Sequence, residues 1–109
     1  MHKSVPESYL SCIEACQECA IECEVCLNAM LGKQSHNDCP NCCYECLEIC
    51  LQCMRALARN SKYAKQYCSL CADICEWCHD QCSKHDMDHC QHCAQSCRKC
   101  ADECRKLAA

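Results

Sequence analysis

The cysteines of this chain repeat at a spacing that suits one kind of backbone. In each of four segments, five cysteines follow one another at alternating intervals of three and four residues. This alternation averages about 3.5 residues, close to one turn of an α-helix, so each set lies along one face of a helix. The twenty cysteines of the four sets are Cys12, Cys16, Cys19, Cys23, Cys26, Cys39, Cys43, Cys46, Cys50, Cys53, Cys68, Cys71, Cys75, Cys78, Cys82, Cys90, Cys93, Cys97, Cys100 and Cys104. The pattern predicts four helices whose cysteine faces meet in one core.

The rest of the composition agrees with a helical fold. Gly occurs once, Pro twice and Phe never among 109 residues, whereas strong helix formers are common. We expect one all-α domain over residues 1–109, with helices at about residues 5–31, 39–59, 62–83 and 87–107. Connections this short make neighbouring helices antiparallel. The predicted fold is an antiparallel up-down-up-down four-helix bundle with a thiol-lined core.

Local signals mark the ends of these helices. Ser4 and Glu7 match a capping box at the start of the first helix, and Gly32 is a typical end signal. Pro40 is expected in the first turn of the second helix, where a missing backbone N–H costs nothing. Asn60 lies in the break before the third helix.

Apolar residues border the cysteine faces, and we expect them to pack helix against helix or subunit against subunit. They follow a cysteine in the first two helices and precede one in the third: Ile13, Ala20, Leu27, Tyr44, Leu47, Leu51, Met54, Tyr67, Leu70, Ile74 and Trp77. Ordinary packing explains these positions, and we assign them no chemistry.

The charges and the hydropathy exclude several partners. The chain carries 15 acidic and 11 basic residues, a net charge of −4, spread along its length. It has no basic block of the kind that neutralises phosphates, so we expect no nucleic-acid partner. It has no apolar run long enough to cross a bilayer, and its start MHKSVPESYL has no signal-peptide core. We therefore expect a cytoplasmic protein without membrane contact.

The cysteines are expected to be thiols rather than disulfides. Secreted disulfide scaffolds are rich in loops, which this sequence lacks, and the cytosol keeps thiols reduced. A single buried cysteine is often an inert small hydrophobe. Twenty on four matching faces are different, because cysteine is much smaller than leucine and an all-thiol core is expected to leave voids. Something should fill that space.

Soft metals are the natural filler, because thiolates select copper(I), zinc and iron–sulfur clusters. Two metal–sulfur bonds of about 2.3 Å in line span about 4.6 Å, so a CxxxC pair on one helix can hold a two-coordinate ion. Zinc prefers four thiolates, and twenty thiolates would hold about five zinc ions. The segment CPNCC at residues 39–43 does not match the loop spacing of iron–sulfur ligands. Copper(I) is favoured because it accepts fewer and shared ligands.

Two alternatives stay open. One is a zinc or mixed soft-metal buffer. The other is a redox-active thiol protein, which would need exposed cysteines of low pKa, whereas burial raises the pKa of a thiol. We do not expect an enzyme, because nucleophilic catalysis needs one activated thiol beside a base, and twenty equivalent thiols suit storage better.

The sequence resembles the bacterial cytosolic copper storage proteins, a family of cysteine-lined four-helix bundles. The resemblance covers the whole chain and rests on the repeated CxxxC spacing, on CSLCADICEWC at residues 68–78 and on KHDMDHCQHCAQSCRKCADEC at residues 84–104. It implies a core that binds many copper(I) ions through the twenty cysteines named above, and a homo-tetramer. Exchange of copper with a chaperone or a chelator is a further expectation.

A few other residues are candidate ligands. Cys42 lies one position off its cysteine face, beside Cys43, and is either a flanking ligand or a packed thiol. The predicted topology gathers most histidines at one end of the bundle, where His36, His85 and His89 are candidate ligands for copper uptake.

Overall fold

A computed structural model describes residues 4–109 of the chain, and it is almost entirely helical. A short 3₁₀ helix, η1 (Glu7–Tyr9), leads into α1 (Leu10–Ala29), which is followed by α2 (Asn41–Ala58), α3 (Ala64–Cys82) and α4 (Asp88–Ala108). No strand occurs within the described residues. The predicted all-α class is confirmed.

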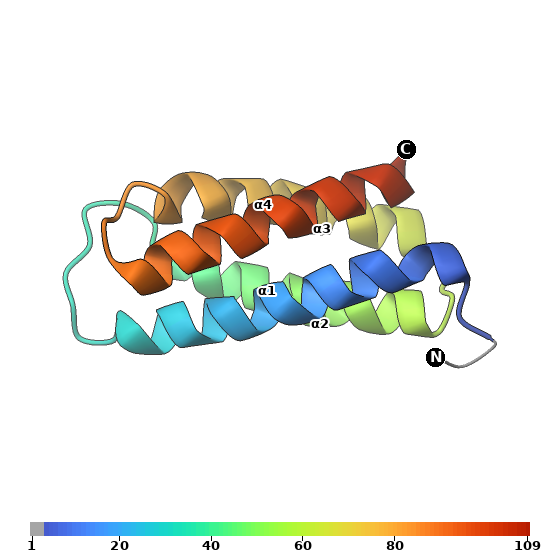
Figure 1. The fold of residues 1–109 in the computed structure, drawn as a ribbon, viewed down its shortest axis with the longest axis horizontal. Helices are drawn as coiled ribbons and strands as arrows, with labels where there is room; N and C mark the ends of the chain where they lie inside the picture. The colour runs from blue at the N-terminus through green and yellow to red at the C-terminus, as the bar shows by residue number, and fades with distance from the viewer. Residues whose placement is uncertain (1–3) are drawn as a thin grey trace.

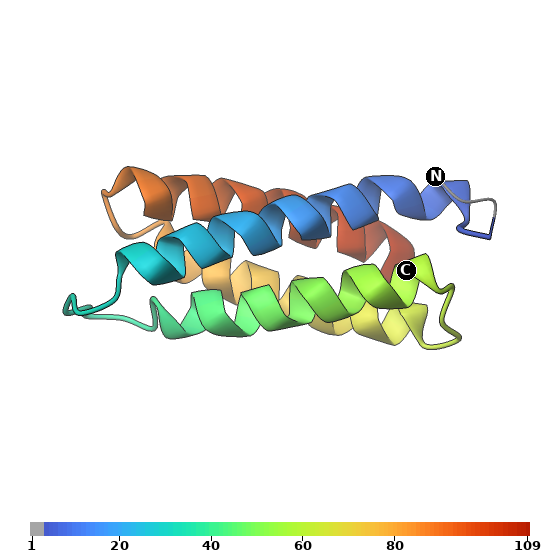
Figure 2. The same ribbon diagram turned by 90° about the horizontal axis from the view of Figure 1, so that it is seen from below.

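The four helices form an elongated bundle of 45 × 23 × 17 Å (Figure 1). Each helix packs against two neighbours, in the pairs α1–α2, α2–α3, α3–α4 and α1–α4. The α1–α2 and α3–α4 connections lie at one end, and the α2–α3 connection lies at the other end with the start of α1 and the end of α4 (Figures 1 and 2). The up-down-up-down arrangement is confirmed. We call the end with the α1–α2 and α3–α4 connections the histidine end, and the opposite end the far end.

The helix ends differ in detail from the predicted signals. The first helical turn among the described residues is the 3₁₀ helix η1, closed by a 3.0 Å hydrogen bond from the Tyr9 N–H to the Pro6 carbonyl, and the α-helix begins only at Leu10. Pro40 lies immediately before α2 rather than within its first turn, and the Cys42 N–H donates to the Asp38 carbonyl at 2.9 Å. Proline has no N–H to offer the helix, so either position accommodates it.

Two connections use left-handed backbone. Gly32, with a φ of 77°, lies three residues beyond the end of α1, and Asn60, with a φ of 50°, lies just after α2. Glycine adopts this conformation freely, and asparagine tolerates it better than most residues. These residues therefore turn the chain back on itself where the sequence predicted breaks.

The core contains every cysteine of the chain, and all of them are buried. Among the bordering apolar residues, Ile13 and Ala20 are buried, and Leu27, Leu47 and Trp77 pack partly against the core. Three others remain exposed on the surface of the chain: Tyr44, Leu51 and Leu70. Some of the bordering apolar residues therefore cover the core, and others are exposed on the surface of the bundle.

Candidate metal centre

Cysteine sulfurs form a continuous column along the bundle axis. Six of the eight CxxxC pairs on the cysteine faces have their Sγ atoms 3.8–4.0 Å apart. These pairs are Cys19/Cys23, Cys39/Cys43, Cys46/Cys50, Cys71/Cys75, Cys78/Cys82 and Cys93/Cys97. The helical period thus brings together the thiols that the spacing pairs along each helix.

Sulfurs from different helices come closer still. Cys12 on α1 lies 3.5 Å from Cys104 on α4, and Cys46 on α2 lies 3.5 Å from Cys75 on α3. Three further contacts measure 3.6–3.7 Å and join Cys26 to Cys90, Cys43 to Cys82 and Cys19 to Cys97. The sequence predicted that the cysteine faces of different helices meet in one core, but not which thiols meet, because that depends on how the helices are aligned against one another.

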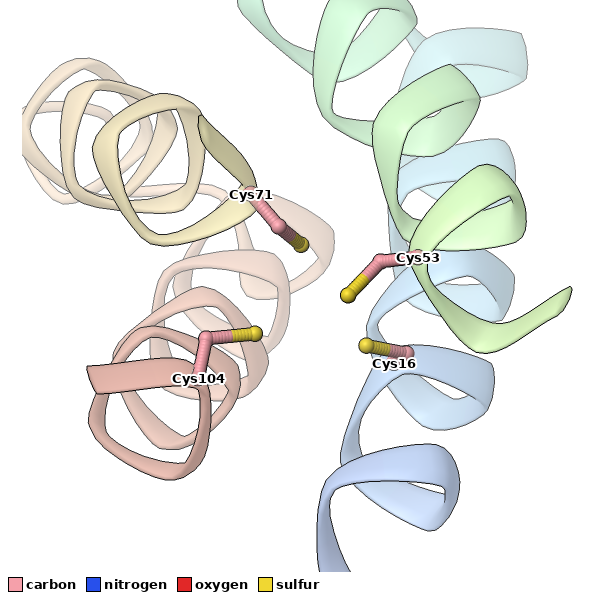
Figure 3. Close-up of side chains that lie close together, drawn as sticks. All are labelled: Cys16, Cys53, Cys71 and Cys104. Atoms are coloured by element: carbon pink, nitrogen blue, oxygen red, sulfur yellow. The ribbon is translucent and has the colours of Figure 1, made fainter. Parts of the chain in front are cut away.

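The column contains ready-made groups of four thiols. In Figure 3, Cys16, Cys53, Cys71 and Cys104 extend one from each helix toward a common centre. The four sulfurs of this group lie within 4.8 Å of one another, as do those of Cys26, Cys39, Cys43 and Cys82 nearer the histidine end. One ion placed in such a group would reach ligands from three or four segments of the chain.

The expected voids are not present between these thiols. Sulfur atoms 3.5–4.0 Å apart are in van der Waals contact, so no empty space separates the sulfurs of these pairs. For bonds of about 2.3 Å, three sulfurs around one ion lie about 4.0 Å apart, whereas two sulfurs in line lie about 4.6 Å apart. The observed separations therefore match three-coordinate sites without rearrangement, and a linear site needs a small spreading of the pair.

Cys42 belongs to the thiol column although it lies off the cysteine face of its helix. Its side chain is 0% exposed, and its Sγ lies 3.9 Å from that of Cys82 on α3. Cys82 in turn lies 3.6 Å from Cys43 and 3.9 Å from Cys39. Because Cys42 follows the Cys39–Pro40 turn at the first turn of α2, its side chain still reaches the core.

The crowding of the thiols shifts their acidity in both directions. Burial is the main cause that raises the pKa of Cys90, and the neighbouring Cys26 raises it further. The contact with Cys100 raises the pKa of Cys16, whereas the contact with Cys104 holds the pKa of Cys12 at about 5. A thiol that accepts a hydrogen bond ionises more easily, and its neighbours then resist a second negative charge.

Three histidines gather at the histidine end, as the sequence predicted. His36, in the α1–α2 connection, is exposed, and its ring centroid lies 5.2 Å from that of His85 in the α3–α4 connection. His85 is 7% exposed. His89, in the first turn of α4, places Nδ1 3.4 Å from Cys26 Sγ and 3.5 Å from Cys90 Sγ, and its buried Nε2 has no hydrogen-bond partner among residues 4–109. His89 therefore contacts the column directly.

The remaining histidines have other surroundings. His79 Nδ1 lies 2.8 Å from the Ala94 carbonyl, a contact that joins α3 to α4, and His92 is exposed. His2 lies outside the described residues. The histidine end also contains Met30, which is 1% exposed, and Met87, which is partly buried.

The α1–α2 connection is attached to the last turns of α3 by polar contacts that sequence reasoning missed. Trp77 Nε1 donates to Asp38 Oδ2 at 3.0 Å, and Gln81 Oε1 accepts from the Asp38 N–H at 3.0 Å. Asn37 Nδ2 donates to the Gln81 carbonyl at 2.9 Å. The sequence offered one signal for Asn37, which is its position between the candidate ligand His36 and Cys39, the first cysteine of its set.

A four-helix bundle whose interior is a column of soft ligand atoms defines a class of protein, the thiolate-lined bundles that suit soft metal ions. Residues 5–109 match the copper storage protein family, and the chain belongs to that family. Its fold is similar to that of the Cu(I)-bound copper storage protein BsCsp3, with 40% identity and a TM-score of 0.90 over 94% of this chain and 100% of that chain.

Two further proteins are similar to this chain. A cytosolic copper storage protein from Streptomyces lividans, in a structure with five coppers, has 31% identity and a TM-score of 0.85 over 94% of this chain and 92% of that chain. The cysteine-rich protein YhjQ of Bacillus subtilis is 42% identical over 75 residues, which are 66% of this chain and 69% of YhjQ. Within the described residues, no helix combines the length and the apolar character needed to cross a membrane.

Proposed function

We propose that this chain stores copper(I) by binding many ions to cysteine thiolates inside the bundle. The observation that carries the proposal is the column of buried sulfurs, in which neighbouring thiols lie 3.5–4.0 Å apart in pairs and within 4.8 Å of one another in groups of four, from Cys12 and Cys104 at the far end to Cys26 and Cys90 at the histidine end. Copper(I) accepts two or three shared thiolates, so one sulfur can bridge two ions. The copper-bound relatives support the choice of metal.

The proposed ligands are the twenty cysteines of the four repeated sets together with Cys42. Cys42 is included because its buried sulfur lies 3.9 Å from that of Cys82, which neighbours several other thiols. The metal preference follows from this shared arrangement, since a sulfur that lies within 4.0 Å of several others, as Cys82 does, suits bridged, low-coordinate ions.

Copper is proposed to be taken up at the histidine end. Neutral imidazoles of His36, His85 and His89 offer borderline ligands there, and His89 already contacts two cysteines of the column. At the far end, Leu57 is fully buried, and Tyr9 and Leu107 pack against the core. The aliphatic side chains of Leu57 and Leu107 offer no ligand atom to an incoming ion. The donor would be a copper chaperone or a small chelator that exchanges ligands with the exposed imidazole.

A cytoplasmic location and the absence of catalysis are part of the proposal. The described relative from Streptomyces is cytosolic, and reduced thiols persist in the cytosol. All the cysteines are buried, which suits storage and disfavours a redox-active thiol that must meet a partner.

Zinc storage is the second candidate, and one observation favours it. The groups of four sulfurs within 4.8 Å of one another have the ligand number that a structural zinc site requires. The two metals differ in capacity, because zinc would use four thiolates for each ion and copper(I) would share them.

Anaerobic titrations of the reduced protein with copper(I) and with zinc, followed by metal counts, test the proposal. We expect more than about ten copper(I) ions per chain against about five zinc ions. A copper(I) endpoint near five would overturn the storage proposal and favour the zinc buffer.

We also propose that the chain assembles as a homo-tetramer. Exposed apolar side chains support assembly, among them Ile21 and Val25 on α1, Tyr44 and Leu51 on α2 and Leu70 on α3. Sedimentation equilibrium should give a mass about four times the 12.4 kDa of one chain. A mass of one chain at micromolar concentration would contradict the tetramer and leave the copper proposal intact.

A further inference from the structure

The histidine end contains one hydrogen bond that decides which nitrogen of His85 is free to bind an ion. His85 Nε2 lies 2.9 Å from Asn37 Oδ1. An amide oxygen only accepts hydrogen bonds, so Nε2 must carry the proton. In a neutral imidazole the other nitrogen, Nδ1, then holds the lone pair.

The orientation of the Asn37 amide is determined by its other contacts. Its Oδ1 also accepts from the Cys39 N–H at 3.0 Å and from Ser35 Oγ at 3.1 Å, while its Nδ2 donates to the Gln81 carbonyl at 2.9 Å. Turning the amide over would place its NH₂ group against a backbone N–H and its oxygen against a carbonyl. All the contacts therefore agree on an oxygen facing His85.

The position of His85 makes this bond relevant to an incoming ion. The ring is nearly buried, so it cannot turn freely to offer either nitrogen, and it lies beside the exposed ring of His36. Its own carbonyl accepts a hydrogen bond from Gln91 Nε2 at 2.6 Å, which holds the backbone of the α3–α4 connection. Metal-binding histidines in proteins commonly have their second nitrogen oriented by such an acceptor.

We propose that Asn37 is a positioning residue for copper uptake: it accepts the Nε2 proton of His85 and thereby presents Nδ1 as the ligand atom. The inference rests on the proposed function of the histidine end. Through the Cys39 N–H, the same oxygen also joins His85 to the start of the cysteine set of α2. Asn37 thus links the orientation of the His85 ring to Cys39, the first cysteine of this set.

The first test reads the tautomer directly in the metal-free protein. Long-range proton–nitrogen correlation spectra of ¹⁵N-histidine protein at about pH 8, above the usual imidazole pKa of about 6.5, distinguish the two tautomers. The parent should show a single Nε2–H form for His85. Asn37→Ala should show a mixture, and Asn37→Asp, which keeps an acceptor oxygen, should restore the Nε2–H form. A pure Nε2–H form in Asn37→Ala would overturn the proposal.

The second test measures copper uptake from a copper(I) chelator by stopped flow. Asn37→Ala should lower the initial rate about tenfold and leave the final capacity unchanged, as for other residues that orient a metal ligand. Gln81→Ala is the matched control, because it removes the Gln81 Oε1 contact to the same connection without touching His85. Its rate should stay within about twofold of the parent.

The outcomes separate this inference from the proposed function. If His85→Ala slows uptake while Asn37→Ala does not, the positioning role is wrong and uptake at the histidine end stands. If Gln81→Ala slows uptake as much as Asn37→Ala, loosening of the connection explains the effect and the positioning role is again wrong. If copper(I) capacity itself is near five, the storage proposal fails independently of either rate.

Discussion

At the scale of the residue, the behaviour of this core follows from the size of a thiol. Cysteine is small enough for sulfurs of several segments to touch one another, and Cys82 illustrates the result. Its Sγ lies 3.6 Å from Cys43, 3.8 Å from Cys78 and 3.9 Å from Cys93. A sulfur with so many sulfur neighbours can bridge ions, which a side chain on an isolated helix could not do.

Cys42 tests whether contact with this network is enough to make a ligand. Cys42→Ser should lower copper(I) capacity by about one ion, because a hydroxyl is a poor ligand for a soft metal. Ala56→Ser is the control, since it also places a hydroxyl at a fully buried position of α2 but removes no thiol. Metal counts after anaerobic titration measure the difference. Equal capacities in Cys42→Ser and the parent would mean that Cys42 is only a packed thiol.

The histidines should control rate rather than capacity. Replacing His36, His85 and His89 together by alanine should slow copper uptake and release about tenfold or more, because an incoming imidazole ligand helps copper(I) to exchange. The final capacity should hardly change, since the thiolates set it. Stopped-flow uptake from a copper(I) chelator measures the effect, with the exposed His92→Ala as control. Parent-like rates in the triple variant would show that these histidines are ordinary surface residues.

At the scale of the element, the two ends of the helices have different chemistry. The histidine end has polar connections attached to α3 through Trp77, Gln81 and Asn37. The far end is closed by apolar side chains, including the fully buried Leu57. Ion pairs such as Arg105 with Asp73 lie on the exposed surface, where they contribute little stability. The apolar contacts therefore carry most of the stability of the metal-free bundle.

This closure predicts a stable fold without metal. Circular dichroism of the reduced, metal-free protein should already show high helicity, and Leu57→Ala should lower the free energy of unfolding by about 2–5 kcal/mol. Gln52→Ala, on the exposed side of the same helix, should change it by less than about 0.5 kcal/mol. Chemical denaturation measures both values. A coil that becomes helical only when copper is added would contradict the assigned role of these apolar contacts.

The far end should also respond differently to loss of its thiols. Cys104 contacts Cys12, and Cys100 contacts Cys16, so both lie toward the closed end of the column. Replacing Cys100 and Cys104 together by serine should lower the copper(I) capacity by about one or two ions with little effect on the initial uptake rate. The same titration and stopped-flow measurements apply. A large fall in the initial rate would place uptake at the far end instead.

At the scale of the whole molecule, copper(I) storage means that metal ions replace many thiol protons inside a closed core. Burial raises the pKa of thiols such as Cys90, and contact with Cys100 raises that of Cys16. A thiol with a raised pKa is protonated at neutral pH and must lose its proton when it binds copper(I). Copper affinity should therefore rise with pH and fall as the solution becomes more acidic.

Proton release on loading measures this exchange. In a weakly buffered solution near pH 7 with a pH indicator, copper(I) loading should release roughly one proton for each protonated thiol that becomes a ligand. Thiols with lowered pKa, such as Cys12, contribute less because they are already ionised. Addition of the copper(I) chelator complex to a protein with alkylated thiols is the control. Loading without proton release would mean that the column is already ionised before copper arrives.

Local patterns in the sequence were sufficient to predict the helices, their antiparallel order and the burial of the cysteines. Helical periodicity is a local property, so the regular spacing of Cys19 and Cys23 indicates a shared face without knowledge of any other segment. Only the tertiary structure decided which thiols meet across helices, such as Cys46 and Cys75, that Cys42 reaches the core, and that Asn37 orients His85. These contacts depend on the alignment and separation of helices, which the packing of all four helices determines together.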